Sequence, residues 1–127
     1  MKTKHTLTIM GAYGLLFGLT GIFGADHFNA YVINSENPDV IRLGRLLFLF
    51  IGGGLTIWIG LIYIFARNAN LAVAKNLLLA HIIGSTLLIC IMSSVGGKES
   101  LFIYNAQSAT PDILLLGLAI FGYLKAK

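Results

Sequence analysis

The chain has 127 residues, of which 57% are hydrophobic and only 11% are charged, whereas a soluble domain carries roughly 25% charged residues. The mean hydropathy of +0.84 therefore excludes an ordinary water-soluble fold and predicts that lipid surrounds most of the protein. The net charge of +4 comes from basic residues scattered in ones and twos rather than gathered in one patch, so we do not expect nucleic acid as a partner.

Four apolar stretches follow one another, at about residues 6–24, 43–66, 71–95 and 111–125. A helix needs about 20 apolar residues to cross the core of a bilayer. The first stretch contains no charge, and we expect it to be a retained span rather than a cleaved signal peptide, because Phe23 occupies a position where a cleavage site needs a small residue. The sequence thus predicts one all-α integral membrane domain over residues 1–127, a four-helix transmembrane bundle with antiparallel, up-and-down helices.

The connections differ in character. Residues 25–40 are rich in polar side chains and predict an outer loop, whereas residues 67–70 predict a tight turn. Residues 101–104 are apolar between polar neighbours, which predicts a re-entrant or interfacial segment before the last span. Thr110, Pro111 and Asp112 have the pattern of a helix start, so the last span is predicted to be short, rising only about 20 Å up to Leu124.

The charges predict the orientation. Basic residues are enriched in the cytoplasmic loops of membrane proteins. Six of them would share one side with both chain ends, and three would face the other side together with all five acids. We therefore expect a multi-pass protein with cytoplasmic N- and C-termini. The first group is Lys2, Lys4, Arg67, Lys75, Lys125 and Lys127, and the second is Arg42, Arg45 and Lys98.

Two groups of glycines predict close helix packing. Gly11, Gly14, Gly18 and Gly21 recur at spacings of three, four and three, so they share one face of the first helix. Small residues on one face let another backbone approach closely, and we expect that backbone to come from the same chain. The run Gly52, Gly53 and Gly54 in the second span predicts a kink, a close helix crossing, or room for a bound ring or tail.

His81 is the ionisable residue that lies deepest in a predicted span. Such residues are costly in lipid and are often functional. Three roles stay open from the sequence: a hydrogen bond to a neighbouring helix, contact with a pigment or haem, or a proton relay or ligand pocket.

Arg42, Arg45 and Asp112 lie at the predicted outer ends of the second and fourth spans. They predict either an ion pair that joins these two helix ends or an anion or headgroup site formed by the arginines.

The chain contains no phosphate-binding glycine loop, no H-E-x-x-H, no G-x-S-x-G and only one cysteine, Cys90. We therefore expect no catalytic or metal-binding residues, no required cofactor and no enzymatic activity. The sequence favours a non-catalytic accessory or scaffolding subunit of a larger respiratory, photosynthetic or transport complex, with the lipid bilayer and other membrane subunits or further copies as partners. The alternative is a small oligomeric transporter or channel with a polar pathway near Arg45, His81 and Asp112.

Overall fold

The computed structural model describes residues 3–96, 98 and 100–126, and the regular structure within them is helical. Four helices are long and apolar enough to cross a membrane, as predicted, and α3, η1 and α4 together form one of them, Pro38–Ala66. A short helix, α2, lies outside these four. In chain order the elements are α1 (Thr3–Phe23), α2 (Ala25–Val32), α3 (Pro38–Leu47), η1 (Phe48–Leu55), α4 (Thr56–Ala66), α5 (Leu71–Gly96) and α6 (Ala106–Leu124).

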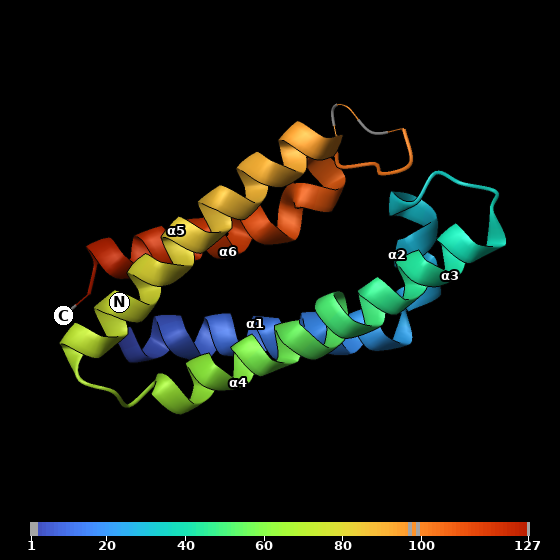
Figure 1. Ribbon diagram of the computed structural model, residues 1–127. Helices are drawn as coiled ribbons and strands as arrows, with labels where there is room; N and C mark the ends of the chain where they lie inside the picture. Colours follow the sequence, from blue (N-terminus) through green and yellow to red (C-terminus); the bar gives the residue numbers. More distant parts are fainter. Residues whose placement is uncertain (1–2, 97, 99, 127) are drawn as a thin grey trace.

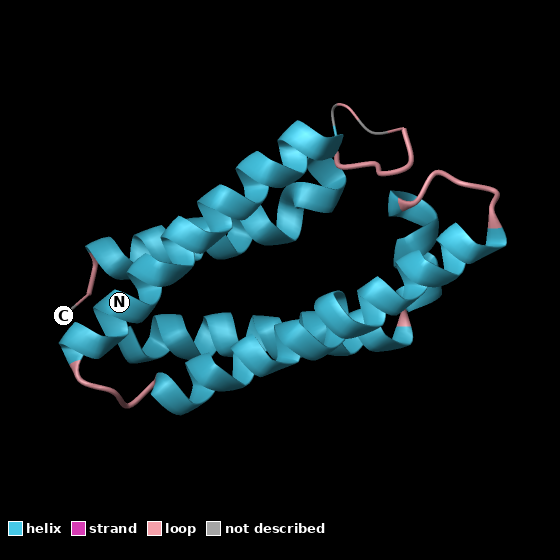
Figure 2. Ribbon diagram, viewed as in Figure 1, coloured by secondary structure: helices cyan, strands magenta, loops and turns pink. Residues whose placement is uncertain are grey.

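The long helices form two pairs, α1 with α3–η1–α4 and α5 with α6 (Figure 1). The two chain ends and the turn after α4 lie at one end of the molecule, and α2 and the α5–α6 connection lie at the other (Figure 2). The pairs meet near the chain ends, where Gly122 of α6 lies against Thr6 of α1. The buried core is here, and it draws on all four long helices through Leu7, Met10, Tyr63, Ala74, Leu78 and Ala119.

The glycine face of α1 packs against η1 and α4. A Cβ atom on Gly14 would lie 3.1 Å from the Gly60 Cα, and one on Gly18 would lie 2.5 Å from Ile57. Gly11 likewise faces α4, and Gly21 faces the carbonyl of Gly52. Any side chain larger than hydrogen would therefore push the two helices apart.

The triple glycine forms part of a π-helix, η1. Gly53 faces α1, where it lies against Ile22, and Gly21 of α1 approaches the Gly52 carbonyl. A Cβ atom on Gly52 itself would meet only Phe48 of the same element, and Gly54 lies on the exposed surface away from other helices. Of the three outcomes predicted from the glycine run, the structure shows the close helix crossing. Glycines hold α-helical dihedrals weakly, and Thr56 supports the wider winding by donating its hydroxyl to the Ile51 carbonyl at 3.1 Å.

The connection at residues 25–40, predicted to be a loop, is largely helical. Residues 25–32 form α2, and the next helix begins at Pro38, so only residues 33–37 lie between them. The prediction of a loop was wrong, because it relied on the many polar side chains and overlooked the helical periodicity of the buried ones. Ala25, Asn29 and Val32 share one buried face, and the Asn29 amide donates to the Ile41 carbonyl at 2.8 Å.

The last span is longer than predicted. Helix α6 begins at Ala106, because the Asn105 side chain accepts hydrogen bonds from the backbone N–H groups of Gln107 and Ser108 at 3.0 and 3.1 Å. Pro111, predicted to lie at the helix start, is therefore inside the helix. The helix reaches 19 residues, enough to cross a membrane without local thinning.

Residues 101–104 are extended and fastened to the end of α2. The backbone of Asn34 donates to the Leu101 carbonyl at 3.0 Å, and that of Ile103 donates to the Val32 carbonyl at 2.7 Å. Ile33 and Phe102 form an isolated antiparallel bridge between these bonds. The segment predicted to be re-entrant or interfacial thus joins the two helix pairs at the end where they otherwise diverge.

Candidate functional site

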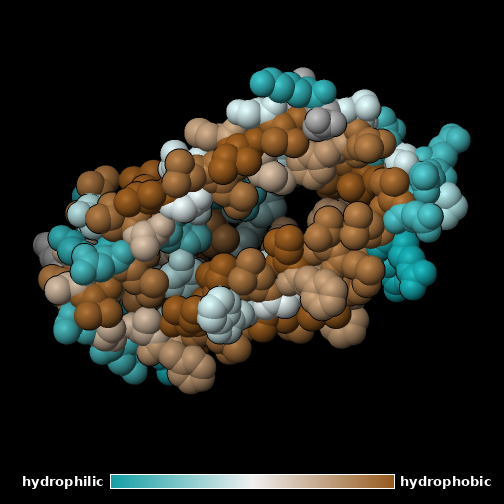
Figure 3. All heavy atoms as spheres, in the orientation of Figure 1, coloured by the Kyte–Doolittle hydropathy of each residue, from teal (hydrophilic) through white to brown (hydrophobic). Residues whose placement is uncertain are grey.

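A cavity of about 340 Å³ lies between the two helix pairs, at the end of the molecule away from the chain ends. The space-filling view shows the molecule hollowed at this position (Figure 3). Its volume is at the lower end of the range for small-molecule sites. The lining side chains are Phe17, His27, Phe28, Tyr31, Val32, Phe48, Met92, Phe102, Tyr104, Asn105, Gln107, Ser108, Pro111 and Asp112.

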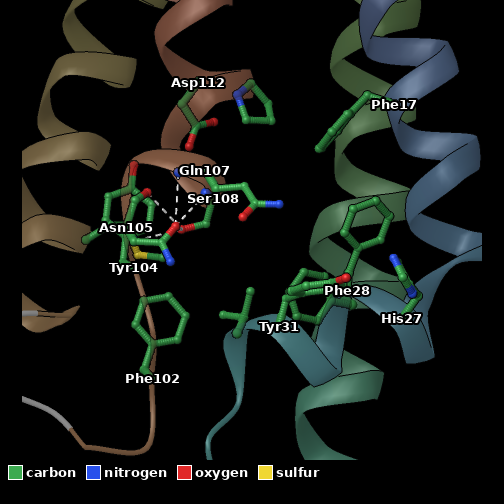
Figure 4. A pocket seen from close by; sticks show the side chains of 14 residues that line it. Phe17, His27, Phe28, Tyr31, Phe102, Tyr104, Asn105, Gln107, Ser108 and Asp112 are labelled. Atoms are coloured by element: carbon green, nitrogen blue, oxygen red, sulfur yellow. Dashed lines mark hydrogen bonds between the residues drawn. The ribbon is translucent and has the colours of Figure 1, made fainter.

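One wall of the cavity is aromatic. The Phe28 ring lies between those of Phe17 and Phe48, with centroid distances of 6.2 and 6.3 Å. Next to it, the His27 ring lies edge-on to Tyr31 at 4.9 Å. These rings come from α1, α2 and η1, and the labelled ones line the α1–α2 side of the cavity in Figure 4. Helix α2 matters here because it carries three of them.

The opposite wall is polar and belongs to the start of α6 (Figure 4). Asp112 is half-buried there, and it forms no ion pair with any residue that the structure describes. The Tyr104 hydroxyl is buried close enough to Asp112 to feel its charge, but it has no hydrogen bond of good geometry within the described chain. Burial, followed by the Asp112 charge, raises the pKa of Tyr104, which therefore keeps its proton at neutral pH.

Local backbone structure fixes this polar wall. Because residues 101–104 are extended, Phe102 and Tyr104 project to the same side, and their rings stack at 6.3 Å. The Ser108 hydroxyl is held by the helix cap, since it accepts from the Asn105 N–H at 2.8 Å and donates to the Asn105 carbonyl at 3.0 Å. The Ser108 hydroxyl proton is therefore directed at a backbone carbonyl and not at a general base. Gln107, one residue earlier, is exposed and points toward the cavity (Figure 4).

The structure separates the arginines from Asp112. Arg45 pairs with Asp26, with Nε and Oδ1 2.8 Å apart, and Arg42 is exposed. The predicted ion pair between the second and fourth spans is therefore wrong for Arg45. Asp26 lies on α2, which packs against α3. Because these residues were predicted to form a loop, Asp26 was not predicted as a partner for Arg45.

His81 lies away from the cavity. Its Nδ1 and the Tyr63 hydroxyl are hydrogen-bonded at 2.5 Å, which joins α5 to α4 beside the core. Its Nε2 is buried without a partner among the described residues, and Gly84, one turn further on, faces open space. Of the three roles that the sequence left open, the hydrogen bond to a neighbouring helix is the contact present. The described residues hold no group of three or more His, Cys, Asp or Glu side chains placed to bind a metal.

Most of the cavity was not predicted from the sequence, which indicated only Asp112 among its lining residues. Two local spacings in the sequence could have indicated parts of the cavity. His27 and Tyr31 are one helical turn apart, and Phe102 and Tyr104 are two positions apart, so in an extended segment they project to the same side. No local signal brings Phe17 to the same wall, because that contact depends on how α1 meets α2.

Comparisons with known proteins add no family: no family model matches the chain, and no curated protein or solved structure matches it significantly. The site itself carries the information on function. The informative features are the aromatic wall, the polar wall that faces it and the carboxylate of Asp112.

Proposed function

We propose that this chain is a multi-pass membrane protein that binds an amphipathic molecule between its two helix pairs. The observation that carries the proposal is the cavity with one aromatic and one polar wall, because a molecule with an apolar body and a polar group satisfies both walls at once. We propose binding as the role of the cavity, and its Ser108 hydroxyl serves the helix cap by donating to the Asn105 carbonyl.

The outer surface of the helices supports insertion in a membrane. Phe23 is 87% exposed, Phe65 80% and Phe50 69%, and many other large apolar side chains are exposed along the four long helices. Lipid is the solvent in which such a surface is stable, whereas in water it would aggregate. We propose that these helices cross the bilayer as an antiparallel bundle with cytoplasmic N- and C-termini, which places the cavity toward the outer leaflet.

The orientation is tested with single cysteines in a Cys90→Ser background. Ala126→Cys lies at the end of the chain near Lys125, and Ser35→Cys lies in the connection between α2 and α3. We expect an impermeant thiol reagent added to intact cells to label Ser35→Cys and to leave Ala126→Cys unlabelled until the cells are opened. The reverse pattern would overturn the proposed orientation.

Binding is tested with photoactivatable probes that share a twelve-carbon chain and carry a trimethylammonium, a hydroxyl or a carboxylate head. In uncharged detergent micelles, we expect at least one probe to label residues 17–32 and 101–112 in preference to the exposed face of α5. Gln107→Trp should reduce this labelling because it fills the cavity without removing a packed side chain. Leu87→Trp adds the same ring to the exposed face of α5 and serves as the matched control. Equal labelling of the whole apolar surface by all three probes would overturn the proposal.

A second role, as a subunit of a larger complex, is favoured by the exposure of α5. Of the most apolar 18-residue stretch of α5, only 6% is buried inside the protein, against 39% for the corresponding stretch of α1. That surface is available to other membrane subunits or to another copy of the chain, and native gels after gentle extraction would show which of them travels with it. Arg45, His81 and Asp112 make three separate sets of contacts, so we do not propose a pathway through all three.

A further inference from the structure

Building on the proposed binding function, we infer that the cavity takes an amphipathic cation, whose ammonium group lies between the Asp112 carboxylate and the aromatic wall. The apolar body of such a molecule would extend along Phe17 and Phe28, on the other side of the cavity. The chemistry required is an ammonium group on an apolar chain, which either a membrane lipid headgroup or a free lipophilic amine can supply.

The charge of the cavity supports a cation. Among the residues that the structure describes, its lining contains no Lys or Arg, and Asp112 is the one acidic residue there. The ion pair in the described chain, Arg45 with Asp26, lies outside the lining and uses the arginine that was expected to reach Asp112. A half-buried carboxylate that has the Tyr104 hydroxyl beside it but no cation among the described residues is costly next to lipid, and a bound cation removes that cost. The other titratable groups that face the cavity are His27, Tyr31 and Tyr104.

The aromatic wall supports the same ligand by a separate argument. The face of an aromatic ring carries partial negative charge and attracts cations within about 6 Å of its centroid. Phe17, Phe28 and Phe48 form one continuous group of rings. Of these, Phe17 and Phe28 lie across the cavity from Asp112 (Figure 4). A neutral apolar ligand would need only aliphatic side chains here, whereas a cation benefits from the rings as well as from the carboxylate.

Tyr104 adds a third observation. Its hydroxyl oxygen is buried on the polar wall beside Asp112, and the contact between the two groups falls short of a well-formed hydrogen bond, whereas buried polar atoms in proteins are nearly always satisfied. A cationic head beside Asp112 would also meet the lone pairs of this oxygen. The carboxylate and the hydroxyl thus favour the same ligand group.

The three photoactivatable probes test this inference through the charge of their heads. We expect the trimethylammonium probe to label residues 17–32 and 101–112 about tenfold more than the carboxylate probe. Asp112→Asn should abolish this preference, and Asp112→Glu should retain it. Asp39→Asn makes the same change in net charge at an exposed position outside the lining, and it should leave the preference intact. Phe17→Leu keeps an apolar side chain but removes a ring, so it should reduce labelling by the trimethylammonium probe more than labelling by the hydroxyl probe.

The outcomes separate the two proposals. Equal labelling of the cavity by all three heads, with a loss in Gln107→Trp, would overturn the cationic ligand and keep the binding function. No selective labelling of the cavity by any probe would overturn both. A loss of preference in Asp39→Asn equal to that in Asp112→Asn would show an effect of net charge and also overturn the inference.

Competition identifies the source of the ammonium group. Unlabelled dodecylphosphocholine carries the head of a membrane lipid, and dodecyltrimethylammonium carries the free cation. Displacement of the trimethylammonium probe by both compounds supports a lipid headgroup as ligand, and displacement by the free cation alone supports a free lipophilic amine. Failure of both to displace the probe would overturn the site.

Discussion

Two neighbouring residues of α1 face two opposite kinds of environment. Gly18 is buried against η1 and α4, where a Cβ atom would lie 3.0 Å from the Gly53 carbonyl oxygen and closer still to Ile57. Phe17, one position earlier, lines the cavity on the way to α6. The Gly18 face of α1 packs directly against η1 and α4, whereas the Phe17 face is separated from α6 by the cavity.

The difference shows what the glycines contribute: they allow a close helix crossing on one face of α1 that the other face does not have. Glycine on both sides of a contact, as at Gly14 and Gly60, brings two backbones together and leaves no room for a ligand. On the α6 side the aromatic rings line a cavity instead of packing against the other pair, and the segment at residues 101–104 is hydrogen-bonded across the far end. A binding site needs a well-packed scaffold next to its cavity, and here the glycine-lined contact of α1 with η1 and α4 lies next to the cavity.

The largest expected effect comes from breaking the glycine-lined contact. Gly18→Leu would force α1 away from Ile57 and should lower the free energy of unfolding by about 3 kcal/mol or more. Titration with dodecyl sulfate in mixed micelles, followed by circular dichroism, measures this change.

Gly84→Leu is the matched control, because a Cβ atom on Gly84 would have no atom of another element within 4 Å. Both substitutions add the same side chain and the same helix propensity, so their difference isolates the contact. We expect Gly84→Leu to change the free energy of unfolding by at most about 0.5 kcal/mol. Equal stability of the two variants would show that the glycine face does not form the glycine-lined contact described above.

A smaller effect is expected on the cavity side, where Asn105 caps α6. Asn105→Ala removes the acceptor for the Gln107 and Ser108 N–H groups and should cost about 1 kcal/mol. Asn105→Asp keeps an acceptor and should cost less. Hydrogen exchange of the first turn of α6 measures the local loosening. If Asn105→Ala left this exchange unchanged, the polar wall would be held by other contacts.

The hydrogen bond between His81 and Tyr63 is expected to contribute less again. Such bonds between membrane helices average about 0.6 kcal/mol, so Tyr63→Phe should destabilise the protein by about that amount. His81→Gln keeps a polar partner and should be milder. A double-mutant cycle on the two residues measures their coupling. A coupling above about 2 kcal/mol, or a change in probe labelling of the cavity, would connect His81 to the binding site instead of to packing.

The number and type of the long helices could be predicted from hydropathy, because lipid imposes a length and an apolar composition on each span. The boundaries were harder. Thr110 and Pro111 are a good helix start by local chemistry, yet the Asn105 and Ser108 pair forms a complete cap one and a half turns earlier. Both patterns are valid, and the longer helix is the one that packs along α5.

Most of the site could not be predicted from the sequence, because it depends on contacts between segments that are distant along the chain. Asp112 could be singled out as an ionisable residue near a span, but its partner could not. That choice depended on α2: once residues 25–32 are helical, Asp26 meets Arg45 and the carboxylate of Asp112 is left without a cation among the described residues. The prediction of a loop at residues 25–40 therefore left out Asp26, the acid that Arg45 meets in the structure.

The smallest expected effect concerns this ion pair, which lies on the α2–α3 side next to the aromatic wall. The Arg45 and Asp26 side chains are 55% and 76% exposed, so water and salt screen their attraction. Arg45→Gln and Asp26→Asn should each cost about 0.5 kcal/mol or less, with a coupling that shrinks further in about 1 M salt. The buried contacts of Asn29 would then be what holds α2, and with it Phe28 and Tyr31, in place. A coupling energy above about 1.5 kcal/mol in a double-mutant cycle that persists in high salt would contradict this expectation. It would show that the ion pair, and not Asn29, is the main contact that holds α2 and the aromatic wall in place.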